Sequence, residues 1–460
     1  MAVMTVTQLF KLGGARRIDA EYYQPEYLML EKRIMGAGFP VNRISEVSNF
    51  VKKGIFDLSP EFYREQGVPF IRVQNIRSGF LNEAELEFIP ITAHQSEIKT
   101  ELKAHDLVLS KVGTIGEVSI IPSKFDRANF SQNVIGIKVD KHKILPGYLL
   151  LFLLSRYGQL QIKRVQMPQV QSKLELEDIR CLKVIRLQSL EEKIHRSVLE
   201  AEGLLEQSNL LYFQTENLLL EELGLKDFKP KYELSYSANL SKASKAHRVD
   251  AEYFQPAYDE IVNHLTRNFV TEKLKDIVSL LKHGKQPYYV EGGEVPILIQ
   301  KHLGSQYINL DALNDQDTPR TDRKFIEKYP EYKVQPGDVL FYSVGAYLGR
   351  TNVLLNQIDA VPASFITLIR TKKNVCSPMF LAVFLNSKVG QLQSDQRKSA
   401  SAQQYIYPKD IGEFIIPILP DKTQQEIASL VQRSYEAREK ARQLLEEAKS
   451  KVENLIEGKG

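Results

Sequence analysis

The chain has 460 residues, of which 43% are hydrophobic and 26% are charged. One hydrophobic core rarely serves a chain of this length, so two or more domains are expected, and the composition excludes a largely disordered protein. Its 61 Lys and Arg residues and 57 Asp and Glu residues give a net charge of +4, which permits a nucleic-acid partner without requiring one.

The cysteine content and the apolar runs indicate a cytoplasmic protein. Cys181 and Cys376 lie far apart and form no CxxC motif, which argues against a disulfide framework and against a cysteine-ligated metal. The start of the chain lacks the pattern of a secretory leader. The longest strongly apolar run, residues 148–155, is too short to cross a bilayer. We therefore expect no metal and no association with a membrane.

A tyrosine-rich motif occurs twice, and we call it the DAEY motif. Residues 17–27 read RIDAEYYQPEY and residues 248–258 read RVDAEYFQPAY, with eight of eleven positions identical. The aromatic side chains are expected to pack, and Pro25 and Pro256 to begin helices. Since the motif is nearly the same in both places, a framework role is favoured over docking of a partner protein.

Three further pairs of segments repeat in the same order, and with the DAEY motif their offsets are 231 to 233 residues. Repetition of this kind indicates a duplicated domain of about half the chain. The pairs are 105–121 with 337–354, 148–161 with 380–393, and 176–187 with 408–419.

Each copy is expected to be mixed α and β. The first pair of segments has short apolar runs that end in Val-Gly, which is typical of strands joined by a tight turn. The second pair has helix-forming composition with a glycine near its end, and the third pair is predicted to form closing strands. Turn chemistry alone accounts for most single Gly and Asp residues here.

A long amphipathic helix is predicted after each copy. Apolar and small residues recur every three or four positions in 187–219 and again in 427–455. Such narrow stripes favour pairing with another helix, although each could instead pack on its own domain. About 35 helical residues at ~1.5 Å each span roughly 50 Å, or one and a half turns of B-DNA at ~34 Å per turn.

The expected fold class is therefore α+β. Two duplicated mixed α/β domains are each followed by a long helix, and the helices pair as an antiparallel coiled coil with pseudo-twofold symmetry. The expected segments are domain 1 at 1–187, a central helix at 188–224, domain 2 at 225–420 and a C-terminal helix at 421–460.

This pattern resembles the specificity (S) subunits of Type I restriction-modification systems over nearly the whole chain. The resemblance is carried by the two DAEY motifs, by the segments DLVLSKVGTIGEV and DVLFYSVGAYLG, and by the two long helices. Either segment alone is moderately specific, whereas their duplication in this order is a strong signal.

The resemblance implies a DNA-binding protein without catalytic activity and without a cofactor. In that family each target-recognition domain reads one half of a split, asymmetric site in double-stranded DNA, and the helix pair sets the gap between the halves. The implied partners are two adenine methyltransferase (M) subunits and restriction or motor (R) subunits. The two copies differ at 72–80 and 299–307, which implies two different half-sites.

Two basic, amide-rich stretches at equivalent places are the first candidates for DNA contact, because such side chains read base edges and neutralise phosphates. An ordinary solvated loop is the alternative in each case. The residues singled out are Lys163, Arg164, Gln166, Gln169 and Gln171 in the first copy, and Arg397, Lys398, Ser401, Gln403 and Gln404 in the second.

A second set of candidates follows the apolar strands and flanks the Val-Gly turns. Plain surface charge is the alternative for each residue. The set comprises Arg72, Gln74, Asn75, Arg77, Lys111 and Thr114 in the first copy, and Gln300, Lys301, His302, Ser343 and Tyr347 in the second.

Other classes of function stay open. The sequence contains no phosphate-binding loop, no HExxH helix, no GxGxxG turn and no Asn/Asp-Pro-Pro-aromatic string, yet scattered carboxylates and histidines could still assemble a catalytic site. The chain could instead be the recognition subunit of a related modification or phage-defence system. It could also be a stand-alone DNA-binding regulator, or a duplicated protein-binding scaffold without salt-dependent affinity for DNA.

Overall fold

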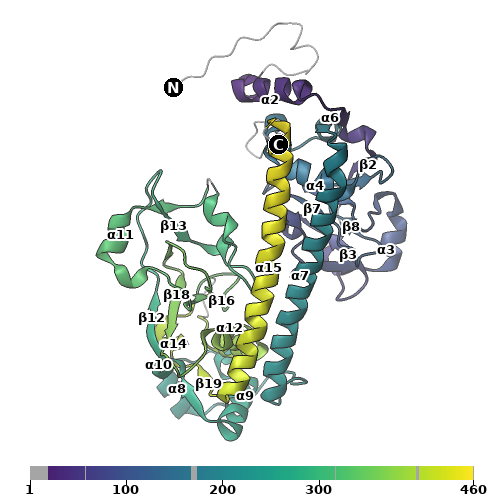
Figure 1. The fold of residues 1–460 in the computed structure, drawn as a ribbon. Coiled ribbons are helices and arrows are strands. Elements are labelled where there is room, and N and C mark those ends of the chain that lie inside the picture. The colour runs from purple at the N-terminus through teal and green to yellow at the C-terminus, as the bar shows by residue number, and fades with distance from the viewer. Residues whose placement is uncertain (1–18, 57, 167–172, 316, 400–402, 459–460) are drawn as a thin grey trace. The chain divides into compact units, whose positions relative to one another are not determined.

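The computed structural model describes residues 19–56, 58–166, 173–315, 317–399 and 403–458. The chain divides into two compact units, with residues 1–206 and 437–460 in unit 1 and residues 207–436 in unit 2 (Figure 1). Each unit combines helices with mixed sheets, which confirms the expected α+β class. Within the described ranges, no helix combines the length and the apolar character needed to cross a membrane.

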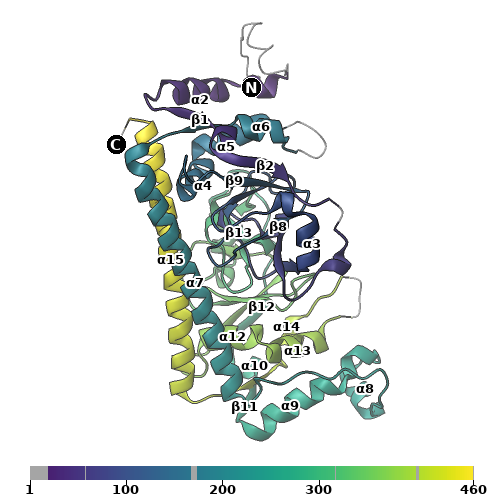
Figure 2. The same cartoon turned by 90° about the vertical axis from the view of Figure 1, so that its right-hand side faces the viewer.

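Among its described residues, unit 1 contains three sheets with strand orders β2-β9-β6-β7-β4, β5-β3-β8 and β1-β10. Figure 2 labels β1, β2, β8 and β9 of these strands. Most neighbours run antiparallel, but β3 pairs with β8 in parallel, and so does β4 with β7. The strands are β1 (Val41–Arg43), β2 (Ser48–Lys53), β3 (Val68–Ile71), β4 (Gly79–Phe80), β5 (Glu87–Ile89), β6 (Leu107–Ser110), β7 (Val118–Ile120), β8 (Asn129–Phe130), β9 (Val134–Val139) and β10 (Lys183–Ile185).

The helices of unit 1 include the start of the first long helix. They are α2 (Pro25–Gly36), α3 (Ile91–Ser96), α4 (Pro146–Leu154), α5 (Arg156–Val165), α6 (Leu176–Cys181) and α7 (Gln188–Glu222), with 3-10 turns at η1 (Ala20–Tyr23), η2 (Ile44–Glu46), η3 (Pro60–Phe62), η4 (Val73–Asn75) and η5 (Ile98–Thr100).

The described strands of unit 2 repeat this pattern without a counterpart of β4, with sheet orders β12-β18-β15-β16, β14-β13-β17 and β11-β19. The parallel pair β13 and β17 corresponds to β3 and β8, and both edge strands β2 and β12 carry a register shift near their start. The strands are β11 (Thr271–Lys273), β12 (Val278–His283), β13 (Val295–Leu298), β14 (Arg320–Thr321), β15 (Val339–Tyr342), β16 (Thr351–Val353), β17 (Val361–Pro362), β18 (Ile366–Thr371) and β19 (Ile415–Pro417).

The helices of unit 2 include the start of the second long helix. They are α8 (Leu240–Ala246), α9 (Pro256–Asn268), α10 (Leu274–Ile277), α11 (Arg323–Lys328), α12 (Pro378–Asn386), α13 (Lys388–Arg397), α14 (Pro408–Ile411) and α15 (Asp421–Ile456), with 3-10 turns at η6 (Ala251–Phe254), η7 (Gln300–His302), η8 (Asp311–Asn314) and η9 (Pro330–Tyr332).

The two long helices run in opposite directions where they meet. In unit 2 the Ser208 hydroxyl lies 3.1 Å from that of Ser434, and the Thr423 hydroxyl bonds to Glu222 at 3.5 Å. As the residue number rises along α7, the partner number on α15 therefore falls. Buried apolar and small side chains line this seam in unit 2, because they continue the spacing of three and four that made each helix amphipathic.

The glycine in the repeated helical segment has a different role from the one its place suggested. The segment forms two helices rather than one, because Ser155 ends α4 and its side chain caps α5 by accepting from the Gly158 N–H at 3.4 Å. A Cβ at Gly158 would lie 2.4 Å from the carbonyl oxygen of Leu153. Gly158 thus permits a sharp break between helices instead of ending one, and Gly390 after Ser387 does the same in unit 2.

The repeated string GQLQ holds sheet and helix together in both units. Gln161 exchanges two hydrogen bonds with the backbone of Lys183, at 2.8 and 2.9 Å, and Gln393 does the same with Ile415 at 2.6 and 3.0 Å. Both glutamines are buried, so their amides replace a strand neighbour at the start of β10 and β19. This string is framework.

Three aromatic side chains of the described part of the DAEY motif, Tyr23, Tyr27 and Tyr258, are buried. Pro25 and Pro256 occupy the first positions of α2 and α9, as expected. In unit 1 the guanidinium of Arg164 lies 4.2 Å from the centre of the Tyr22 ring and its Nε donates to the Tyr22 carbonyl at 3.1 Å. In unit 2 the Gln396 amide donates to the Tyr253 carbonyl at 3.4 Å. These contacts support a framework role for the motif.

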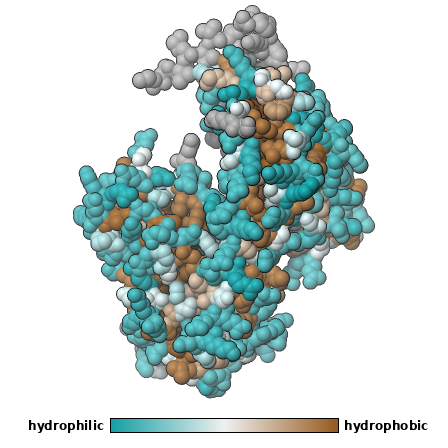
Figure 3. Space-filling model, viewed as in Figure 1, coloured by the Kyte–Doolittle hydropathy of each residue, from teal (hydrophilic) through white to brown (hydrophobic). Residues whose placement is uncertain are grey.

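The exposed residues are mainly polar. On the face shown in Figure 3, hydrophilic side chains separate smaller hydrophobic areas. Many apolar side chains instead fill cores such as the one around α4, where Tyr148 and Phe152 are fully buried. Scattered apolar areas of this kind are normal on protein surfaces and do not by themselves mark a binding site.

Candidate nucleic-acid interface

In unit 1, four loops meet at one end of the five-stranded sheet, where β2 and β6 end and β9 and β7 begin. The Ile55 N–H donates to the Phe130 carbonyl at 2.8 Å, and the Lys111 N–H donates to the Asn133 carbonyl at 3.0 Å. The Ser131 N–H donates to the Ile71 carbonyl at 2.9 Å. We call this region end surface 1, and it comprises residues 54–56, 72–74, 111–115 and 131–133.

Two more of the predicted residues lie beside end surface 1. Lys163 and Gln166, at the end of α5, line an open pocket of about 420 Å³ together with Ile115. The structure therefore brings them next to the turn that carries Lys111 and Thr114. Gln169 and Gln171 lie outside the described residues.

Unit 2 has a corresponding region, end surface 2, which comprises residues 283–286, 343–347, 363–365 and 403–407. It forms where β12 and β15 end and β18 and β16 begin. The Gly345 N–H donates to the Gln404 carbonyl at 2.8 Å, and the Ser343 N–H donates to the Phe365 carbonyl at 2.9 Å. Ser401 lies outside the described residues.

A glycine is required at the same place in both end surfaces. A Cβ at Gly54 would lie 1.8 Å from the carbonyl oxygen of Phe130, and a Cβ at Gly284 would lie 2.1 Å from that of Ala363. Real atoms cannot approach so closely, so any side chain would push the strand away from its neighbour. These glycines set the path of the loop that follows each edge strand.

Two predicted DNA-binding residues, Asn75 and His302, are fully buried instead. Each closes a 3-10 turn after the strand: Asn75 Oδ1 accepts the Arg72 N–H at 2.9 Å, and His302 Nδ1 accepts the Ile299 N–H at 2.9 Å. Burial lowers the pKa of His302 to about 4, so its imidazole is neutral near pH 7. Both side chains shape the turn rather than face solvent.

Two predicted arginines also serve the framework. Arg72 donates to the Glu85 carbonyl and to Glu87, both at 3.2 Å. Arg164 contacts Tyr22 as described and Glu31 at 3.1 Å. Although burial opposes it, hydrogen bonding from Lys183 and Arg164 lowers the pKa of Glu31, which keeps the carboxylate charged.

In unit 2, four of the predicted residues are engaged by neighbouring groups. Ser343 is fully buried and bonds to Thr367 at 2.6 Å. The other three have these partners: Lys301 pairs with Asp315 at 3.1 Å and Asp317 at 2.5 Å, Lys398 pairs with Asp395 at 3.0 Å, and Arg397 donates to Gln396 at 2.8 Å and to the Glu413 carbonyl at 3.4 Å.

The remaining predicted residues are exposed or half-buried. The guanidinium of Arg350 lies 4.0 Å from the centre of the half-buried Tyr347 ring. The exposed residues are Gln74, Arg77, Thr114, Lys163, Gln300 and Gln403, and those half-buried besides Tyr347 are Lys111, Gln166 and Gln404. These residues stay candidates for contact with DNA.

The structure adds residues that sequence reasoning missed. Phe56, which is 73% exposed, lies on end surface 1, and Lys285 and Gln286 lie exposed on end surface 2. Tyr407 is 45% exposed beside Tyr405, with ring centres 4.7 Å apart. The sequence feature that could have identified these residues is the pair of strings KKG at 52–54 and KHG at 282–284, which lie at equivalent strand ends.

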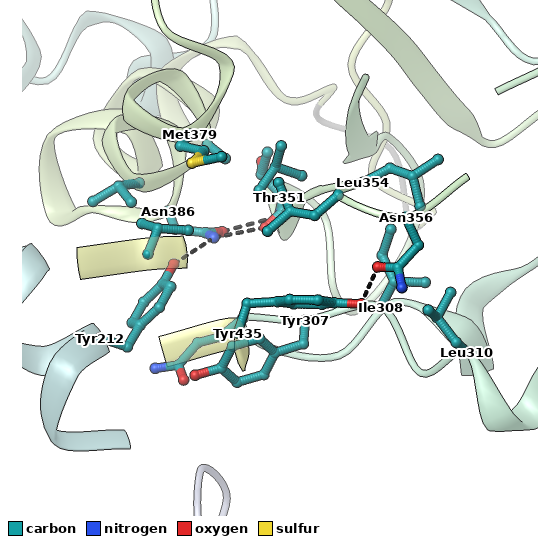
Figure 4. A pocket seen from close by; sticks show the side chains of 16 residues that line it. Tyr212, Tyr307, Ile308, Leu310, Thr351, Leu354, Asn356, Met379, Asn386 and Tyr435 are labelled. Atoms are coloured by element: carbon teal, nitrogen blue, oxygen red, sulfur yellow. Dashed lines mark hydrogen bonds between the residues drawn. The ribbon is translucent and has the colours of Figure 1, made fainter. Parts of the chain in front are cut away.

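A second polar cluster lies inside unit 2, where α7, α15 and α12 meet (Figure 4). Its cavity measures about 20 Å³, which is room for one water molecule. Asn386 donates to the Tyr212 hydroxyl at 3.2 Å and to the Thr351 carbonyl at 2.6 Å, while the Tyr435 hydroxyl donates to Asn356. This cluster joins helices to sheet and offers no space for a nucleic acid.

Among the residues that the structure describes, no group of three His, Cys, Asp or Glu side chains could hold a metal ion. What the end surfaces offer is amides, hydroxyls, lysines and exposed rings on hydrogen-bonded loops. Such groups bind a ligand through hydrogen bonds, positive charge and stacking.

The chain is similar to several known proteins. Residues 38–192 and 267–450 match the family described as "Type I restriction modification DNA specificity domain". The specificity subunit of the Type I restriction enzyme EcoBI from Escherichia coli is 25% identical over 159 residues, which cover 34% of this chain and 33% of that protein. The match thus spans a third of that relative's length.

Two solved structures are also similar. The Type I restriction-modification S subunit from M. genitalium shares 14% identity with a TM-score of 0.39, covering 91% of this chain and 95% of that one. The HsdS subunit from Thermoanaerobacter tengcongensis shares 15% identity with a TM-score of 0.29, covering 92% and 97%. Because the family match covers most of the sequence, the chain belongs to the family of Type I restriction modification DNA specificity domains.

Proposed function

We propose that the chain is the specificity subunit of a Type I restriction-modification complex and reads a bipartite, asymmetric DNA site in the cytoplasm. Each unit contributes one target-recognition domain, so that end surface 1 meets one half-site and end surface 2 meets the other. The observation that carries this proposal is the pair of end surfaces: the same strand ends and the same required glycines present different side chains.

The long helices are proposed to fix the gap between the half-sites. Helix α7 has 35 residues and α15 has 36. At ~1.5 Å per residue each is roughly 50 Å long, about one and a half turns of B-DNA. We place the recognition domains at 1–187 and 225–420, the spacer helices at 188–224 and 421–460, and a pseudo-twofold axis between the halves.

The chain itself catalyses nothing in this proposal and needs no cofactor. Chemistry comes from two adenine methyltransferase (M) subunits and from restriction or motor (R) subunits that it holds on DNA. Exposed amides and hydroxyls supply readout of base edges, while lysines such as Lys163 supply phosphate contacts that weaken with salt.

The test is to co-express the chain with candidate methyltransferase subunits in a host that lacks adenine methylation, and to map modified adenines by long-read sequencing. A split motif with a constant gap is the expected result. Exchanging 1–187 for the corresponding domain of a relative should change one half of the motif only. A stable complex that methylates no motif would favour a phage-defence subunit of another kind or a protein-binding scaffold.

A further inference from the structure

One position has a corresponding place in both end surfaces and carries a different kind of side chain in each. It is the second residue after the required glycine, Phe56 in unit 1 and Gln286 in unit 2. Because both glycines lie against the backbone of the neighbouring strand, β8 or β17, the loop leaves both edge strands from the same place.

The backbone before Phe56 is tightly fixed. Ile55 is 6% exposed, its N–H donates to the Phe130 carbonyl at 2.8 Å, and its carbonyl accepts the Gln132 N–H at 2.9 Å. The next side chain, Phe56, is 73% exposed. A large ring is thus presented to solvent from an anchored backbone.

The Gln286 amide is held by its neighbours rather than buried. Its Oε1 accepts from the Ser364 hydroxyl at 3.0 Å, and its Nε2 donates to the Pro287 carbonyl at 3.2 Å and to the Tyr289 hydroxyl at 3.3 Å. Tyr289 is 62% exposed, so a ligand acceptor can take its place at Nε2. Oε1 keeps a second lone pair for a donor.

We propose that Phe56 and Gln286 are specificity-determining residues, with Phe56 reading a thymine methyl group in one half-site and Gln286 reading an adenine in the other. This inference rests on the proposed function. A phenylalanine ring contacts the thymine methyl in the major groove, whereas a glutamine amide accepts from adenine N6 and donates to N7. The chemical difference at one shared position then gives the two halves different readouts.

Replacing single atoms or groups of the DNA bases tests both contacts. The assembled methyltransferase complex is titrated with a duplex that contains the split motif identified by methylation mapping. Uracil in place of thymine removes one methyl group at a time, and 7-deazaadenine removes N7. For the unchanged protein we expect one thymine in the first half-site and one adenine in the second at which affinity falls roughly 5- to 150-fold.

The protein variants complete the cycle. Phe56→Gln should lose sensitivity to uracil in the first half-site only, and Phe56→Leu should keep part of it because the contact stays apolar. Gln286→Phe should lose sensitivity to 7-deazaadenine in the second half-site only. The matched controls are Phe213→Gln and Gln214→Phe, two exposed positions on α7 that should leave both profiles unchanged.

The failure of this inference is distinct from the failure of the proposed function. If the unchanged complex methylates no split motif, the proposed function fails before any variant is made. If it reads a split motif but no uracil or 7-deazaadenine position depends on Phe56 or Gln286, this inference is wrong and the proposed function stands. Equal loss on both half-sites by a variant with unchanged melting temperature would also overturn the inference.

Discussion

Units 1 and 2 solve the same structural problem with different side chains. Both use a buried side chain to close the 3-10 turn after the parallel strand, but unit 1 uses Asn75 and unit 2 uses His302. The guanidinium above the tyrosine of the DAEY motif comes from Arg164 in unit 1, and in unit 2 from Arg248, 4.5 Å from the Tyr253 ring centre. The two units therefore share the geometry of the framework even where the residues that form it differ. The side chains presented on that framework can differ as well.

Alanine at the shared glycines should have the largest effect on both units. A Cβ at Gly54 or Gly284 would collide with backbone, so each variant should lose about 3 kcal/mol or more of unfolding free energy. Chemical denaturation followed by circular dichroism measures the loss. Gly203→Ala is the control, because nothing lies within 4 Å of a Cβ there and alanine in the exposed helix should stabilise slightly. Wild-type stability of Gly54→Ala would show that the strands are not so closely apposed.

Acid should destabilise the 3-10 turn of unit 2 more than that of unit 1, because the side chain that closes the turn is a histidine in unit 2 and an asparagine in unit 1. The pKa of His302 is about 4 in the folded state against an ordinary value of 6.5, so the unfolded state takes up the proton first. Stability present above pH 6.5 is lost as the pH falls toward 4, by roughly 3 kcal/mol in total. Denaturation at pH 7 and pH 5 measures the slope.

His302→Asn, which copies Asn75, is the variant that isolates this histidine. It should keep the turn and remove its part of the slope, whereas His302→Ala should destabilise at every pH because it leaves the Ile299 N–H without its acceptor. An unchanged slope in His302→Asn would assign the acid sensitivity to other groups.

Substitutions at two neighbouring residues on α5 should have different effects, because one residue belongs to the framework of unit 1 and the other is a candidate for DNA contact. Arg164→Ala should lower the unfolding free energy by about 1 to 3 kcal/mol, because it removes hydrogen bonds to Tyr22 and Glu31 and the contact with the Tyr22 ring. Lys163→Ala should leave stability unchanged and weaken DNA binding, with a shallower dependence of affinity on salt. Denaturation and DNA-binding titrations of both variants test this. A loss of stability in Lys163→Ala together with a loss of DNA binding alone in Arg164→Ala would show that the inward face of α5 has been misidentified.

The smallest effect is expected at Ser364, which orients the Gln286 amide. Ser364→Ala should reduce discrimination in the second half-site by about 0.5 to 1 kcal/mol without changing the melting temperature. Competition binding with duplexes altered at single positions measures it. A loss in the first half-site would contradict the assignment of unit 2 to the second.

Much of the framework could be predicted from the sequence, because local patterns determine it. The strands around the Val-Gly turns, the prolines that begin α2 and α9 and the stripes of the long helices all depend on residues close together in the chain. The break at Ser155 was missed because both halves of the segment have helix-forming composition, and the cap that divides them is a single side chain.

The candidate site was harder to predict, because exposure depends on distant partners. Arg164 was expected on the surface, but Tyr22 and Glu31 lie more than 130 positions away and draw it inward. Phe56 is the opposite case. From the sequence, a phenylalanine beside Ile55 cannot be distinguished from a core residue, but in the fold its side chain is exposed. Composition identifies the loops, and only packing decides which side chains face outward.

The central claim is that each end surface meets its own half-site. A photo-crosslinking amino acid at Gln74 or at Gln286, both exposed, tests it directly in the assembled complex on a duplex with the methylated motif. We predict that Gln74 crosslinks to bases of one half-site and Gln286 to bases of the other, with no crosslinks in the gap. Crosslinks from both positions to the same half-site, or to DNA regardless of sequence, would contradict the claim.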